Sequence, residues 1–155
     1  MNSAEYYMLE ALKEAKKALD INEVPIGAVI VKDGMIIGRG YNMRESKNDP
    51  TLHAEIIAIK EASNYLSSWR LTECEMYVTI EPCMMCSGAI YQSRIKKLYY
   101  GSKDLKMGMV DSNLELLYFQ KLNHKVEVES GILSDECSMI VKNFFKQLRI
   151  KKSAK

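Results

Sequence analysis

The sequence predicts an α/β fold in which helices cover both faces of one sheet. Helical and extended patterns alternate along the chain, and strands separated by helices produce this layered architecture. Residues 26–31 form a continuous apolar run, which is typical of a strand that is covered on both faces. No repeat, linker or low-complexity stretch interrupts the 155 residues, and this length suits a single domain over residues 1–155.

The first half of the chain predicts two helices around a hairpin. Apolar residues recur at helical spacing over about residues 4–20, and the strand 26–31 follows. Residues 32–34 contain Asp-Gly, a strong hairpin signal, and a return strand occupies 35–41. A second helix, rich in Ile and Ala and expected to be buried, covers about residues 54–67.

The second half of the chain continues the alternation. In order, the patterns predict a strand at 76–80, a helix from Pro82 to about Ser93, a strand at 97–100, a brief helix at 114–119 and a strand at 126–129.

A basic helix and tail, about residues 135–155, close the chain. One apolar stripe of this helix comprises Cys137, Ile140, Val141, Phe144, Phe145 and Leu148. Its basic residues, with no acid among them, are Lys142, Lys146, Arg149, Lys151, Lys152 and Lys155. This charge predicts either a nucleic-acid contact or simply a solvated face, because the net charge of the whole chain is only +2.

Composition excludes several classes of protein. The apolar fraction of 47% and charged fraction of 27% exclude a disordered chain, a collagen and a coiled coil. No window approaches 18 uncharged apolar residues, so we expect no membrane span. The N-terminus lacks the features of a signal peptide, which favours a cytoplasmic protein. Four unevenly spaced cysteines in such a protein argue against a disulfide framework.

Two short motifs carry the chemistry: His53-Ala54-Glu55 and Pro82-Cys83-Met84-Met85-Cys86, both at predicted helix N-termini. Cysteines three apart on a helix differ by about 60° around its axis, so both thiols face one way. A helix N-terminus favours the thiolate, which is the form that binds zinc. With His53 as a third ligand, the fourth tetrahedral position stays open for water, as in catalytic zinc sites.

Glu55 adds a proton carrier to this predicted site. Residues i and i+2 point to nearly opposite sides in the middle of a helix. At the first turn, with His53 just outside the helix and Glu55 inside it, both side chains can reach one site. A carboxylate beside zinc-bound water can take its proton and pass it to a substrate.

Simpler interpretations remain open at this point. The Cys-x-x-Cys pair alone is compatible with a thioredoxin-like redox pair, and Cys74 or Cys137 could close the zinc site as a fourth ligand. Otherwise Cys74 and Cys137 are expected to be buried apolar residues. His124 is expected to be a hydrogen-bonded structural or loop residue.

The sequence resembles the tRNA-specific adenosine deaminases of bacteria, within the zinc-dependent cytidine/deoxycytidylate deaminase superfamily, whose signature is His-x-Glu followed by Pro-Cys-x-x-Cys. The resemblance runs through nearly the whole chain. It is carried by residues 23–28, His53-Ala54-Glu55, 68–71, 77–86, Asn123-His124, and Phe144-Phe145 with Arg149.

This resemblance implies a cytidine-deaminase-like three-layer α/β/α fold with a five-stranded mixed sheet, and a homodimer. It implies one zinc per subunit on His53, Cys83 and Cys86, with Glu55 as the proton shuttle. The implied reaction converts the wobble adenosine of an arginine tRNA, anticodon ACG, to inosine, and the implied partner is the anticodon stem-loop.

The resemblance also implies contacts with the substrate. The implied residues are Asn42, Asp104, Lys106, Phe145 and Arg149. Turn chemistry is the alternative role for Asp104, and core packing is the alternative for Phe145. The chain departs from the family at residues 107–112, where a Gly-rich stretch ending in Gly-Ser is usual, in a loop that the family places near the substrate and the dimer contact.

Three other functions compete with this one. A deaminase of a free base or nucleotide, such as guanine or cytosine, would share the metal motif, although a small neutral base needs no basic helix. A thiol–disulfide oxidoreductase would need neither His53 nor Glu55. A non-enzymatic zinc-containing RNA-binding module would bind tRNA without releasing ammonia.

Overall fold

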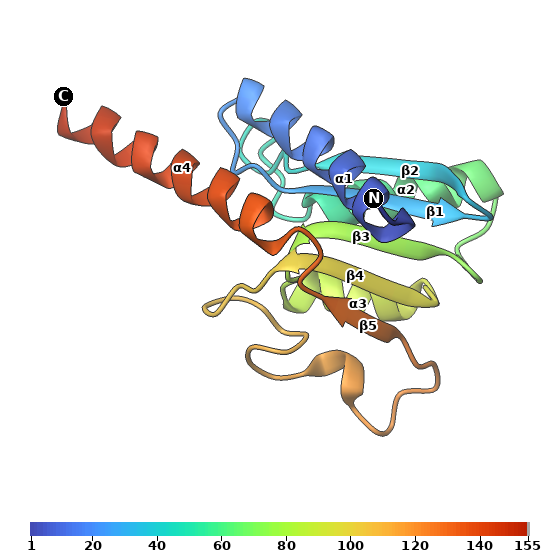
Figure 1. Cartoon of the computed structure of the whole chain (residues 1–155). Coiled ribbons are helices and arrows are strands. Elements are labelled where there is room, and N and C mark those ends of the chain that lie inside the picture. The colour runs from blue at the N-terminus through green and yellow to red at the C-terminus, as the bar shows by residue number, and fades with distance from the viewer. Residues whose placement is uncertain (155) are drawn as a thin grey trace.

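One five-stranded sheet lies between two layers of helices in the computed structural model, which describes residues 1–154 (Figure 1). The elements are α1 (Ser3–Asp20), β1 (Gly27–Lys32), β2 (Met35–Tyr41), α2 (Ala54–Leu66), β3 (Glu75–Ile80), α3 (Met84–Gln92), β4 (Lys97–Ser102), η1 (Leu116–Tyr118), β5 (Glu127–Ser130) and α4 (Ser134–Ser153). The predicted α/β fold and its succession of elements are confirmed. Pro82, however, precedes α3 and does not lie in its first turn.

The sheet is mixed and has the strand order β2-β1-β3-β4-β5. β1 pairs antiparallel with β2 and with β3, whereas β3–β4 and β4–β5 are parallel. Asp33 and Gly34, with φ of 50° and 76°, connect β1 to β2. Positive φ at both central residues is what a two-residue hairpin of right-handed twist requires, so the Asp-Gly prediction is confirmed.

Two apolar cores lie on opposite faces of the sheet, because successive side chains of a strand point to opposite faces. On β3, Met76 and Val78 pack with α2 and α3, whereas Tyr77 packs with α1 and α4. β1 divides in the same way, with Ile30 on the first face and Val29 on the second. Burial of both faces explains why β1 is a continuous apolar run.

Helix α2 packs very closely on the hairpin through its alanines. A Cβ placed on Gly40 would lie 2.3 Å from the Ala54 carbonyl oxygen, and one on Gly38 would lie 2.4 Å from that of Ala58. Only glycine permits this approach of helix and strand backbones. The burial expected for this helix is therefore confined to its alanine face, and the isoleucines are half-buried. The close packing fixes the N-terminus of α2, where the predicted site begins.

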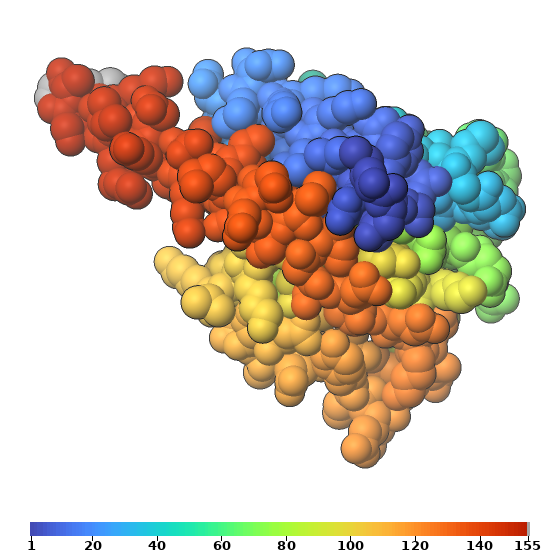
Figure 2. Space-filling model, in the orientation of Figure 1, coloured from blue at the N-terminus to red at the C-terminus, as the bar shows by residue number. Residues whose placement is uncertain are grey.

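Helix α4 packs on the sheet only at its N-terminal end. Cys137 is buried, whereas Phe145 and Leu148 are 39% and 37% exposed. The C-terminal part of α4 projects away from the other helices and the sheet (Figures 1 and 2). The predicted apolar stripe thus exists as a helix but is covered for only part of its length. No helix within residues 1–154 combines the length and apolar character needed to cross a membrane.

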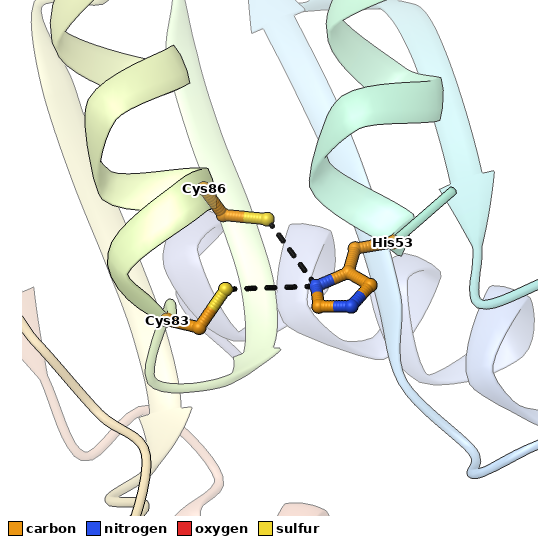
Figure 3. A group of neighbouring side chains, drawn as sticks. All are labelled: His53, Cys83 and Cys86. Atoms are coloured by element: carbon orange, nitrogen blue, oxygen red, sulfur yellow. Dashed lines mark hydrogen bonds between the residues drawn. The ribbon is translucent and has the colours of Figure 1, made fainter. Parts of the chain in front are cut away.

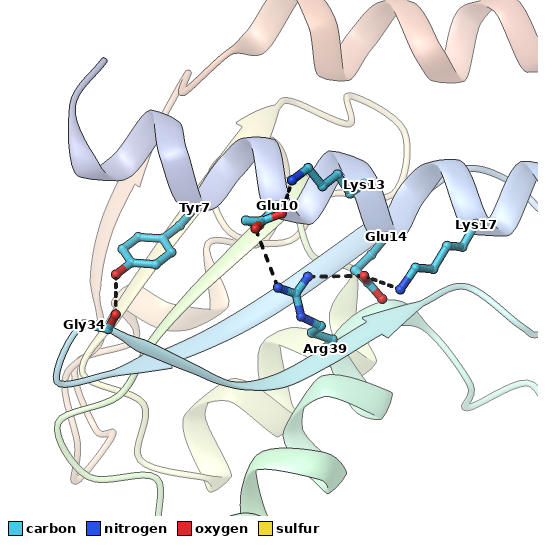
Figure 4. A network of polar contacts seen from close by, with 7 residues as sticks. All are labelled: Tyr7, Glu10, Lys13, Glu14, Lys17, Gly34 and Arg39. Atoms are coloured by element: carbon cyan, nitrogen blue, oxygen red, sulfur yellow. Dashed lines mark hydrogen bonds and ion pairs between the residues drawn. The ribbon is translucent and has the colours of Figure 1, made fainter.

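A network of ion pairs ties α1 to β2 (Figure 4). Arg39 on β2 reaches two acids of α1, with its Nη1 3.3 Å from Glu14 Oε2 and its Nη2 3.7 Å from Glu10 Oε1. Lys17 and Lys13 pair with the same two acids from α1 itself, at 2.7 and 3.0 Å. Glu14 is nearly buried, and a buried acid requires such partners.

Candidate active site

His53, Cys83 and Cys86 meet between the N-termini of two packed helices (Figure 3). His53 Nδ1 lies 3.6 Å from the Sγ atoms of both cysteines. The donor atoms of the three residues all lie within 4.8 Å of one another, which makes them a group able to hold a metal ion. The structure therefore brings together the three residues that the sequence predicts as ligands.

The helix starts explain this convergence. His53 and Cys83 are the N-cap residues of α2 and α3, with extended backbones, and neither side chain caps its own helix. Their side chains are thus available to point across the gap between the helices. Cys86 lies in the first turn of α3, so its thiol returns to the same side as that of Cys83.

The donor set and its spacing fit zinc. Tetrahedral zinc, with Zn–N of about 2.0–2.1 Å and Zn–S of about 2.3 Å, separates a ligand nitrogen from a ligand sulfur by about 3.5 Å. The observed separations of 3.6 Å agree with this value. Within residues 1–154, the group contains neither Cys74 nor Cys137, so the closed four-ligand alternative lacks support. Both are buried free thiols, as expected.

The three groups share protons unequally. Hydrogen bonding with Cys86 and His53 lowers the pKa of the Cys83 thiol to about 4, although burial opposes this shift. The Cys83 thiolate and burial together raise the pKa of Cys86. The hydrogen bond with Cys83 raises the pKa of His53. One thiolate therefore forms readily here, and a divalent cation would replace the remaining protons.

Glu55 lies in the first turn of α2 and lines the same cavity as His53 and Cys83. The side chain is 3% exposed, and burial raises the pKa of its carboxyl to about 7. The predicted geometry, with His53 outside the helix and Glu55 inside it, is confirmed. A carboxyl with a pKa near neutrality can both accept and donate a proton, as a general acid–base group must.

A cavity of about 460 Å³ opens in front of this cluster. Its walls come from the ends of β2 and β3, from the end of β4 and the segment that follows it, and from the first three turns of α4. The cavity therefore lies at the carboxyl end of the parallel strands, where α/β sheets commonly bind ligands.

The structure separates the five predicted substrate residues into two sets. Asn42, Asp104 and Phe145 line the cavity. Lys106 and Arg149 are exposed and lie outside its lining. Asp104 also makes the turn contacts that were its alternative role, since its Oδ1 accepts hydrogen bonds from the backbone N–H groups of Lys106 and Met107.

Three basic residues outside the five predicted substrate residues also line the cavity: Arg44, Lys103 and Lys142. Lys103 and Lys142 belong to basic runs of the sequence, and those runs are the signal that could have identified them. Arg44 stands in a stretch with no such signal. All three are exposed, so the rim of the cavity carries three basic side chains beside the carboxylate of Asp104.

Two further buried acids were not predicted as site residues: Glu81, which lines the cavity, and Glu23, which precedes the lining residue Val24. Glu23 accepts hydrogen bonds from the backbone N–H groups of Glu45 and Ser46, at 3.1 and 2.8 Å. Glu81 accepts hydrogen bonds from the segment that follows β4. Burial acts to raise the pKa of Glu81, but hydrogen bonds from Ser112 and nearby backbone groups bring it below its ordinary value.

Asn123 and His124 have structural contacts. His124 Nε2 lies 2.7 Å from the Ile95 carbonyl oxygen, and the Asn123 backbone N–H donates to the Tyr91 hydroxyl at 3.2 Å. Both contacts hold the segment before β5 against α3 and the residues between α3 and β4. His124 is thus a hydrogen-bonded structural residue, as expected.

Comparison with known proteins agrees with this site. A family model of MafB19-like deaminases matches residues 1–149. The tRNA-specific adenosine deaminase of Streptococcus pyogenes serotype M1 is 52% identical over 147 residues, which cover 95% of this chain and 86% of that protein. The tRNA-specific adenosine deaminase of Bacillus subtilis (strain 168) is 47% identical over 154 residues, covering 99% and 96%.

Solved structures show the same fold. A structure from studies of A-to-I editing by tRNA:A34 deaminases at the wobble position of transfer RNA superposes with a TM-score of 0.84 and 43% identity, covering 87% of this chain and 98% of that one. The guanine deaminase of Bacillus subtilis superposes with a TM-score of 0.64 and 32% identity, covering 96% and 94%. By its sequence, its fold and its His/Cys/Cys group, the chain belongs to the MafB19-like deaminases and, among them, to the tRNA-specific adenosine deaminases.

Proposed function

We propose that this protein is a zinc-dependent deaminase that converts adenosine to inosine at the wobble position of a tRNA anticodon, that of an arginine tRNA reading ACG, and releases ammonia. The observation that carries this proposal is the convergence of His53, Cys83 and Cys86 beside the buried Glu55, in a cavity with a basic rim. The relatives that are about half identical support the choice of tRNA as substrate.

The residues present divide the chemistry between them. His53, Cys83 and Cys86 would hold one zinc ion per subunit. The chemistry that zinc supplies when bound is Lewis acidity, which makes a water molecule acidic enough to lose its proton near neutral pH. Glu55 accepts that proton and delivers it to N1 of adenine. Water oxygen then bonds to C6. Glu55 takes the remaining proton from that oxygen and delivers it to the amino nitrogen, so the C6–N6 bond breaks and ammonia leaves.

An RNA loop is the substrate that suits the surroundings of the cavity. A base must leave its stack to reach a buried site, at a cost of a few kcal/mol that is smallest in a single-stranded loop. We expect the exposed side chains of Arg44, Lys103 and Lys142, which line the cavity, to contact the phosphates on either side of the flipped nucleotide. Phe145, which lines the cavity and is 39% exposed, offers a stacking face for a neighbouring base.

The test is deamination of matched RNA hairpins. Zinc-loaded protein is incubated with an arginine anticodon stem-loop whose first anticodon base is adenosine, and with a control hairpin in which that adenosine exchanges places with a neighbouring base. We expect inosine and equimolar ammonia from the first hairpin only. Inosine from neither hairpin, or equally from both, would contradict the proposal.

Deamination of free guanine is the second candidate, because the guanine deaminase of Bacillus subtilis shares the fold at 32% identity. The two candidates differ in their need for phosphate contacts. Release of ammonia from guanine, at a rate that RNA does not reduce, would favour the second candidate over the first.

We propose in addition that the protein acts as a cytoplasmic homodimer. Large apolar side chains on the α2–α3 side of the molecule support an interface between copies, since Tyr65, Trp69 and Met84 are more than half exposed. Light scattering coupled to gel filtration measures the mass in solution, and the mass of a single chain at micromolar concentration would contradict the dimer.

A further inference from the structure

Glu81 is a buried acid that joins two functional segments of the chain. It follows β3, lies two residues before Cys83, and is only 2% exposed. Its carboxylate accepts five hydrogen bonds from one short segment after β4. The donors are the backbone N–H groups of Asp104 (3.1 Å), Val110 (3.1 Å), Asp111 (2.9 Å) and Ser112 (2.9 Å), and the Ser112 hydroxyl.

The segment that Glu81 holds, residues 103–112, forms part of the cavity wall. Lys103, Asp104, Leu105 and Met107 all line the cavity. The segment has no helix or strand of its own over 103–112, so its backbone N–H groups need partners from elsewhere. The two oxygens of the Glu81 carboxylate are the acceptors for four of these N–H groups.

Gly108 shows how tightly the segment wraps around this carboxylate. A Cβ on Gly108 would lie 2.3 Å from Glu81 Cδ and 2.5 Å from Oε1. The Gly108 N–H donates to the Asp104 carbonyl at 2.8 Å, which closes a turn directly over the carboxylate. Only a residue without a side chain fits this place.

Consecutive hydrogen bonds connect Glu81 to residues of the cavity wall. Glu81 Oε1 accepts from the backbone N–H of Asp104, and Asp104 Oδ1 in turn accepts from the N–H groups of Lys106 and Met107. The Met109 N–H donates to the Pro82 carbonyl oxygen at 3.0 Å, so the same segment is also tied to the residue before Cys83. The orientation of Asp104 thus depends on an acid that lies at the cavity wall but is almost completely buried.

We propose that Glu81 is a positioning residue for the RNA substrate, holding residues 103–112 in the one conformation that presents Lys103 and Asp104 to the nucleotide in the cavity. The inference rests on the proposed function, because it assigns RNA contacts to this segment. In this role Glu81 makes its hydrogen bonds to residues 104–112 and not to the nucleotide. It acts through the segment that it organises.

Glu81→Gln is the variant that tests these consecutive hydrogen bonds. An amide oxygen at the Oε2 position keeps the bonds to Val110, Asp111 and Ser112. The amide NH₂ then faces the Asp104 N–H, so that bond is lost and two donors confront each other. Loss of such a charged acceptor typically weakens an interaction by about tenfold, which corresponds to about 1.4 kcal/mol.

Two measurements on zinc-loaded protein decide the matter. We expect KM for the arginine anticodon hairpin to rise about tenfold while kcat and zinc content stay unchanged, since only binding through the segment is weakened. We also expect trypsin to cleave after Lys103 and Lys106 at least several times faster, as scored by mass spectrometry. Glu14→Gln, which removes an equally buried acid on α1, is the matched control and should change neither.

The results for Glu81→Gln distinguish a role in positioning the segment from a role in supporting the metal site. Unchanged KM and unchanged cleavage in Glu81→Gln would overturn the proposal, and a fall in kcat with lost zinc would make Glu81 a support of the metal site instead. If Glu81→Gln does not fold, Ser112→Ala, which deletes one hydroxyl donor, should shift KM and cleavage in the same directions by a smaller factor. Inactivity of the unaltered protein on RNA would refute the proposed function, and the cleavage assay would still test whether Glu81 holds the segment.

Discussion

Replacing Glu55 by glutamine should lower the deamination rate and raise the stability of the folded protein. The amide keeps the size and burial of the side chain but can neither accept nor deliver the proton that deamination transfers. General acid–base groups contribute about 10²–10⁴-fold to rate. The activation barrier should therefore rise by about 3–5 kcal/mol, at about 1.4 kcal/mol for each tenfold. Zinc should remain bound, because Glu55 is not among the residues of the metal group.

The gain in stability follows from burial of the carboxyl. Its pKa is about 7 in the folded chain, against an ordinary value of 4.5. Because the folded state binds this proton more tightly than the unfolded state, the associated stability is fully present below pH 4.5 and is lost as the pH rises through about 7. The difference corresponds to about 3 kcal/mol. A glutamine amide does not ionise, so the variant should not lose this stability as the pH rises.

The assay compares thermal unfolding of the metal-free proteins at pH 5 and pH 8, alongside single-turnover deamination by the zinc-loaded proteins. Relative to the unaltered chain, Glu55→Gln should unfold at a higher temperature at pH 8 and show a smaller difference at pH 5. Glu14→Gln, whose acid is paired with Arg39 and Lys17, should show no such gain. A Glu55→Gln variant that retained activity, or that lost zinc, would refute the role assigned to Glu55.

Four further changes test other parts of the molecule. Cys86→Ser should abolish binding of zinc, measured by metal analysis, whereas Cys74→Ser should retain one zinc per chain; retention by Cys86→Ser would remove it from the ligand set. Deleting residues 146–155 should weaken hairpin binding and flatten its salt dependence, because phosphate contacts release counterions; unchanged binding would leave the projecting end of α4 without that role. Asp104→Asn should lower the ratio of the deamination rate on an RNA hairpin to that on a matched DNA hairpin, because Asp104 is expected to accept a hydrogen bond from a ribose 2′-OH. An unchanged ratio would leave Asp104 as a turn residue. Gly40→Ala should lower the free energy of unfolding by about 1–3 kcal/mol or more in chemical denaturation, because its Cβ would meet the backbone of α2 at 2.3 Å, and a fully stable variant would contradict that packing.

The order of elements and the grouping of His53, Cys83 and Cys86 were predictable from the sequence because both depend on local signals. Apolar spacing defines helices and strands, and Asp33-Gly34 selects the hairpin turn by its backbone conformation. His53 and Cys83 stand at helix starts, where short spacings determine on which side a residue points. Glu55 lines the same cavity as His53 for a similar local reason. It lies only two residues after His53, in the first turn of α2.

The tertiary structure alone decided which segments meet. Glu81 lies in the stretch 77–86 that carries the family resemblance, but nothing in that stretch indicates its contacts, and its hydrogen-bond donors lie 23 to 31 residues further along the chain. Likewise the apolar stripe of α4 is continuous in the sequence, yet only its first turns find the sheet, because burial depends on how far the partner surface extends. Periodicity and spacing report the conformation of neighbours in the chain. The cavity rim, its basic charge and the acid that holds residues 103–112 arise from contacts between distant segments, which no local pattern encodes.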